Sequence, residues 1–173
     1  MIKIVNMKIK NLKNKSGFTL VEILAVLFVV SLGMIGVLSL IIQNIKGQNI
    51  NKNSIVAYQL AQEGVELVRK VRDTNWKNST PFNQNLGEGK YYMSYSDETP
   101  NILATEDNGN LYKDADDFYV HGGGASQTNF NRIIEITAPN THSIIVHSIV
   151  SWTEHNQDYS YVLEASLFDW LNP

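Results

Sequence analysis

The stretch KSGFTLVEILAVLFVVSLGMIGVLSLII, residues 15–42, determines how this chain is organised. From Phe18 to Ile42 it has 25 residues with no Lys, Arg, Asp or Pro, and Glu22 is its only charge. At about 1.5 Å per residue, a helix of this length crosses a hydrocarbon layer of about 30 Å. The stretch therefore predicts a membrane-spanning helix over residues 18–42, with a carboxylate near its start.

Basic residues gather on one side of the apolar segment. Residues 1–17 contain five lysines and no acid, whereas only Lys46 and Lys52 closely follow the segment. Because positive flanks stay in the cytoplasm, we expect the N-terminus inside and residues after about 43 outside. A secretory signal peptide has a shorter apolar part, about 7–15 residues, that ends at a small-residue cleavage site. Here the small residue is Gly17, before the apolar run, so a cut there would leave the hydrophobic segment on the mature chain.

The segment KSGFTLVEILAVL resembles the prepilin signal of the type IV pilin-like proteins. In that family a dedicated peptidase cuts after the glycine and methylates the new N-terminal amine. The resemblance implies that Gly17 precedes the cut, that Phe18 is the methylated first residue, and that Glu22 is the glutamate five positions into the mature chain. The pattern is specific, because a basic leader, Gly-Phe-Thr-Leu-x-Glu and a long apolar helix must all coincide.

Glu22 needs an explanation, because a charged side chain at the centre of a spanning helix costs about 2.5–3.5 kcal/mol on insertion scales. Cleavage after Gly17 would create a cationic amine at Phe18, one helical turn from the carboxylate. In a filament, the resemblance implies, Glu22 of one subunit neutralises the amine of a neighbour, and the attraction is large where water is absent. The alternative is an incidental polar residue near the membrane boundary. We predict that Glu22 is an assembly residue.

An amphipathic continuation of the helix is predicted over residues 43–76. Its polar beginning, QNIKGQNINKNS, contains Gly47, which costs a helix about 1 kcal/mol relative to alanine, so we expect a bend or a frayed turn there. Beyond it an apolar stripe with helical period must bury against another surface. The stripe consists of Ala57, Leu60, Ala61, Gly64, Val68 and Val71.

Residues 77–173 have the turns and short alternating segments of a β-rich extracytoplasmic domain. Strands are predicted over 91–95, 130–137, 143–153 and 159–168, and the last two flank HNQD as a hairpin. We therefore predict an α+β fold: a long N-terminal helix, transmembrane in its first half and amphipathic in its second, packed on a C-terminal antiparallel sheet of about four strands. This arrangement agrees with the resemblance, since pilin-like proteins place such a helix against such a sheet.

Charge and composition disfavour other partners. Loss of the leader leaves nine of the 14 basic residues against 17 acidic ones, a side-chain charge of −8, so we expect no nucleic-acid partner. The chain has no cysteine, which excludes disulfides despite an extracytoplasmic location. The oxygen-rich loop EDNGNLYKDADD, residues 106–117, has ligands that suit Ca²⁺, but its spacing does not fit an EF-hand, and a solvated acidic loop is the preferred interpretation.

No catalytic site emerges from the sequence. His142 and His147 lie five residues apart, on opposite faces of a strand, so no metal is assigned. A nucleophile, a base and an orienting residue cannot be nominated together, and we expect neither enzyme activity nor a cofactor.

The favoured interpretation is therefore a structural subunit, most like a minor pilin. It would be inserted as a single-pass precursor in the cytoplasmic membrane, cleaved after Gly17 and assembled through its N-terminal helix into a cell-surface type IV pilus. The resemblance implies four partners: the prepilin peptidase/methyltransferase, other pilin subunits, an inner-membrane assembly platform and the lipid bilayer. A pseudopilin of a type II secretion system and a membrane-anchored adhesin that does not polymerise remain as alternatives.

Overall fold

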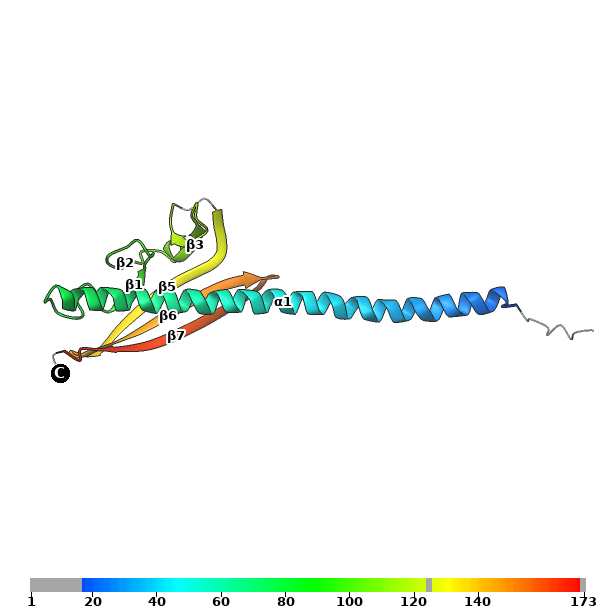
Figure 1. Cartoon of the computed structure of the whole chain (residues 1–173), viewed down its shortest axis with the longest axis horizontal. Coiled ribbons are helices and arrows are strands. Elements are labelled where there is room, and N and C mark those ends of the chain that lie inside the picture. Colours follow the sequence, from blue (N-terminus) through cyan, green and yellow to red (C-terminus); the bar gives the residue numbers. More distant parts are fainter. Residues whose placement is uncertain (1–16, 124–125, 172–173) are drawn as a thin grey trace, which may run out of the picture. The chain divides into compact units, whose positions relative to one another are not determined.

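The computed structural model describes residues 17–123 and 126–171, so the predicted leader, apart from Gly17, lies outside the described residues. The chain divides into two compact units between Lys46 and Gly47. The first unit contains the beginning of the only α-helix in the described part of the chain. The second contains the rest of that helix together with the β-sheet (Figure 1).

Helix α1 (Leu20–Lys77) begins at a capping residue and continues through both units. The backbone amide of Glu22 donates to Thr19 Oγ1 at 3.2 Å, which satisfies one of the free donors at the helix start. Gly47 lies inside the uninterrupted helix, so the expected frayed turn is wrong. The propensity cost of one glycine, about 1 kcal/mol, is small for a helix of 58 residues.

In the first unit the large apolar side chains of α1 are exposed all round the helix. An 18-residue window has a mean hydropathy of 2.8, and none of it is buried. By length and composition this helix is apolar enough to cross a membrane.

Within the described residues the sheet has seven strands, all in antiparallel pairs, rather than about four. The three long predicted strands are present, whereas the additional ones are too short for a repeating pattern to be read from the sequence. A four-residue 3₁₀ turn, η1 (Glu106–Gly109), precedes β3. The strands are β1 (Gly89–Tyr92), β2 (Asn101–Ile102), β3 (Asn110–Lys113), β4 (Tyr119–His121), β5 (Ser126–Asn140), β6 (Ser143–Glu154) and β7 (Gln157–Phe168).

The predicted hairpin is formed by β6 and β7. Glu154 pairs with Gln157, and the two residues between them, His155 and Asn156, have φ angles of 51° and 63°. Two consecutive left-handed residues are the signature of a type I′ turn, whose twist suits a two-residue hairpin. The turn sets the register that places Ile144 opposite Leu167 on the buried face.

The inner face of the sheet packs on the apolar stripe of α1, and all six predicted stripe residues are buried. Between helix and sheet lie two apolar clusters, one around Val68 and Ile134 and the other around Leu60 and Trp152. A third group, Gly64, Arg132 and Ser148, belongs to neither cluster although all three residues are buried. The core thus includes a polar layer, at which the helix approaches the sheet closely.

Gly64 is required at this close approach, and Gly64→Ala is expected to destabilise the second unit by about 1–3 kcal/mol. A Cβ atom at Gly64 would lie 2.3 Å from Ser148 Oγ and 3.4 Å from Arg132 Cδ. Urea unfolding of the full chain in detergent measures the effect. Gly47→Ala is the matched control, because a Cβ atom there meets nothing within 4 Å and alanine favours the helix.

Ser148→Ala should relieve part of the Gly64→Ala penalty, since it removes the Oγ atom and leaves Ser148 Cβ at 3.2 Å. We expect the free energy of unfolding of the double variant to exceed the value predicted from the sum of the two single-variant effects by at least about 0.5 kcal/mol. Strict additivity of the two substitutions would contradict the contact.

Candidate functional site

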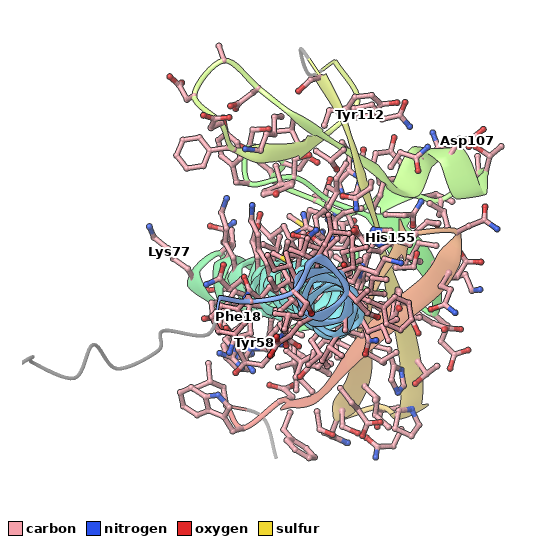
Figure 2. The ribbon with its side chains drawn as sticks, turned by 90° about the vertical axis from the view of Figure 1, so that its right-hand side faces the viewer. Phe18, Tyr58, Lys77, Asp107, Tyr112 and His155 are labelled. Carbon is pink, nitrogen blue, oxygen red and sulfur yellow. The ribbon has the colours of Figure 1, made fainter. Side chains whose placement is uncertain are left out.

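The three predicted processing and assembly residues lie together at the start of α1. Gly17 and Phe18 precede the helix, and Glu22 is in its first turn (Figure 2 labels Phe18). Phe18 is 78% exposed, and the Glu22 side chain is also exposed. Phe18 and Glu22 line a shallow notch of about 270 Å³ whose other walls are aliphatic, from Ile23, Val26 and Leu27. The exposed carboxylate therefore stands in an otherwise apolar surface.

The electrostatic setting of Glu22 has one favourable element. A carboxylate in the first turn interacts well with the positive end of the helix dipole, by about 0.3–1 kcal/mol. Within residues 17–123 and 126–171 the Glu22 carboxylate forms no ion pair. In the uncleaved chain the Phe18 nitrogen is a peptide nitrogen, so the cationic partner would exist only after a cut at Gly17.

The family model described as the prokaryotic N-terminal methylation motif matches residues 12–38, a span that contains this cluster. The chain carries a type IV pilin-like prepilin signal. Such a signal implies processing by a peptidase, anchoring in a membrane and assembly with other pilin subunits, in a family that is structural rather than catalytic. No curated protein and no solved structure gives a significant match.

In the acidic loop, residues 106–117, carboxylates accept hydrogen bonds from the loop's own backbone and from nearby side chains. Asp114 Oδ1 accepts the backbone amides of Asp116 and Phe118, both at 2.9 Å, while its Oδ2 accepts the Tyr95 hydroxyl at 3.2 Å. The Asp114 carboxylate raises the pKa of the Tyr95 hydroxyl. Asp117 pairs with Lys113 Nζ at 3.1 Å. No group of three or more His, Asp or Glu side chains in the described part is arranged to hold a metal ion.

The two histidines considered as metal ligands have separate partners. His147 Nε2 lies 3.0 Å from Glu164 Oε2, across from it on β7, whereas His142 Nδ1 lies 2.9 Å from the Thr141 hydroxyl. The structure does not bring them together.

Arg132 is the principal polar residue that the sequence analysis missed. Its side chain is fully buried and joins α1 to the sheet: Nη1 donates to the Leu60 carbonyl at 3.1 Å and Nη2 to the Met93 carbonyl at 2.7 Å. Glu63 Oε2 lies 3.3 Å from Nη1. Burial lowers the pKa of the guanidinium, and the Glu63 carboxylate opposes that shift. The sequence did contain a signal for this burial. Arg132 lies two residues after Phe130 on a predicted strand, so the two side chains are on the same, buried face.

His121 lies in the electrostatic field of the same arginine. Burial and, second, the positive charge of Arg132 lower the pKa of the imidazole to about 4. Its backbone amide donates to Ser94 Oγ at 2.9 Å, and its Nδ1 lies 3.2 Å from the Asn108 carbonyl. The ring is therefore neutral in the folded protein at neutral pH.

The free energy of unfolding should fall as the pH is lowered from about 6.5 to about 4. In that range the unfolded chain binds a proton at His121 that the folded chain does not bind, so stability is lost toward acid, by at most about 1.4 kcal/mol per pH unit. Unfolding curves of the wild type and of His121→Phe, measured across this pH range, separate the stability lost through His121 from the stability lost through protonation of carboxylates.

Proposed function

We propose that the chain is a minor-pilin-type structural subunit of a type IV pilus, cleaved after Gly17 and assembled through its N-terminal helix. The observation that carries the proposal is the methylation motif over residues 12–38 on a helix whose apolar side chains, in the first unit, are exposed on every side. Such a surface needs lipid before assembly and neighbouring helices afterwards. The long, cysteine-free outer domain favours a minor over a major pilin.

In this proposal the chain has four functional segments. Residues 1–17 are a cleaved leader, 18–42 the membrane and assembly helix, 43–76 its amphipathic continuation and 77–173 the extracytoplasmic domain. The precursor spans the cytoplasmic membrane once, with its N-terminus inside, as the lysines of the leader favour. The peptidase/methyltransferase and the assembly platform act on it there, and the mature subunit then enters a surface filament with other pilins.

Intact-mass and N-terminal analysis tests the first step. The protein is purified from membranes of cells that contain or lack the prepilin peptidase. We expect a mature chain that begins at methylated Phe18 only when the peptidase is present. Gly17→Val should block the cut, whereas Gly33→Val, within the apolar helix, should be processed like the wild type. An unprocessed chain with and without the peptidase would refute the proposal in favour of a simple tether.

A further inference from the structure

A groove in the outer domain is not explained by assembly through the N-terminal helix. It has a volume of about 520 Å³, within the usual range of ligand sites, and four strands contribute to its walls. It forms where β5 leaves β6 and pairs with β3, and Figure 1 shows β5 curving at that point. The register of β3 on β5 shifts between Asn110 and Tyr112, an irregularity that bends the sheet.

One row of polar side chains crosses three strands in the groove. Asn110 of β3 pairs with Asn131 of β5, which pairs with Ser151 of β6. The Asn131 amide donates to Asn110 Oδ1 at 3.1 Å, so the two amides orient each other and the Asn110 NH₂ group is left as a donor. A Cβ atom at Gly109 would lie 2.6 Å from Asn131 Oδ1, so a larger residue there would displace this amide.

A second polar row runs beside the first, two residues further along the strands. Thr153 Oγ1 donates to Asp158 Oδ1 at 2.7 Å across the hairpin, which orients the carboxylate and leaves its second oxygen as an acceptor. Asn129 reaches the Thr153 carbonyl at 3.5 Å. Neighbouring strands lie about 4.8 Å apart, and residues two apart along a strand about 7 Å. The groove thus presents a grid of oriented donors and acceptors.

We propose that this groove binds a neutral saccharide. Amide, hydroxyl and carboxylate groups together match a ligand rich in hydroxyl groups, each of which both donates and accepts. Its described lining contains Asp158 and neither lysine nor arginine, so an anionic ligand would be repelled. Its two large apolar residues, Phe130 and Trp152, are buried and offer no pocket for an apolar peptide side chain.

The surface next to the groove also suits a sugar ring. Ile133 pairs with Ile149, which pairs with Val162, and this row lies two residues along the strands from Asn131 and Ser151. Val162 is 52% exposed. The C–H face of a pyranose could cover these aliphatic side chains while its hydroxyl groups meet the polar rows.

Binding is measured with the full-length protein in detergent on immobilised neutral oligosaccharides built from glucose, galactose, N-acetylglucosamine and N-acetylgalactosamine. Ser151→Tyr places a bulky ring in the groove from the outer face of β6, and we expect at least about a tenfold loss of affinity for any glycan that the wild type binds. Ser166→Tyr, on the exposed face of β7 away from the groove, is the matched control and should bind like the wild type.

The inference would be overturned if the wild type bound no glycan in the panel, if Ser151→Tyr bound as well as the wild type, or if the two tyrosine variants lost binding equally. Stronger binding to a sialylated form of the same glycan would also contradict it, since Asp158 should disfavour added negative charge. Unfolding curves for both variants establish that they fold. The assay does not depend on cleavage at Gly17, so its failure and the failure of the pilin proposal are distinguishable.

Discussion

Replacing Glu22 with alanine is expected to reduce incorporation of the chain into filaments by more than about a hundredfold, while membrane insertion and cleavage continue. In the proposed filament, the substitution would leave the cationic amine of a neighbouring Phe18 unpaired in an apolar interface. Removing one member of a buried charge pair costs about 3–5 kcal/mol, and each 1.4 kcal/mol is about a factor of ten. Immunoblots of sheared filaments and of membranes measure the two pools of mature protein.

Two variants separate charge from side-chain size at this position. Glu22→Gln keeps the length of the side chain and should fail like alanine, because the proposed interaction with the amine is ionic. Glu66→Ala removes an exposed carboxylate elsewhere on α1 and should assemble normally. Wild-type incorporation of Glu22→Ala would instead indicate that the helix is only a tether.

Arg132→Ala should have the largest effect on stability, a loss of about 3–5 kcal/mol. It empties a fully buried site and leaves the Met93 carbonyl without its 2.7 Å hydrogen bond. Small domains are stable by only about 5–15 kcal/mol, so much of the margin would disappear. Tryptophan fluorescence of the full chain in urea follows the transition, since Trp152 lies in the adjoining apolar cluster.

The comparison variants for this prediction differ in which interaction they lose. Arg132→Met refills most of the volume but leaves the Met93 carbonyl unpaired, so its loss should be smaller than that of alanine. Arg69→Ala breaks only an exposed pair with Glu66 and should cost less than about 1 kcal/mol. A loss below about 1 kcal/mol for Arg132→Ala would show that the buried guanidinium does not hold helix and sheet together.

Local patterns in the sequence were sufficient to predict the long helix and the long strands. The uninterrupted apolar run predicts the spanning segment, the helical period from Ala57 to Val71 predicts the buried stripe, and alternation with HNQD between two strands predicts the hairpin. Each depends on residues that are neighbours in the chain. The cluster of Gly17, Phe18 and Glu22 was predictable for the same reason, and its role in cleavage and assembly stays a prediction.

Only the tertiary structure shows the features that depend on distant residues. Local propensity could not predict that α1 continues through Gly47, because one glycine changes the helix free energy by only about 1 kcal/mol. It also could not predict the strands of two to four residues, because these are too short to show a repeating pattern. The guanidinium of Arg132 finds its acceptors 72 and 39 residues away, and the groove combines β3 with β7. The sequence by itself determined which segments are apolar and with what period. The sheet register decided which polar groups meet, because cross-strand partners are set by packing and hydrogen bonding between segments that no local pattern connects.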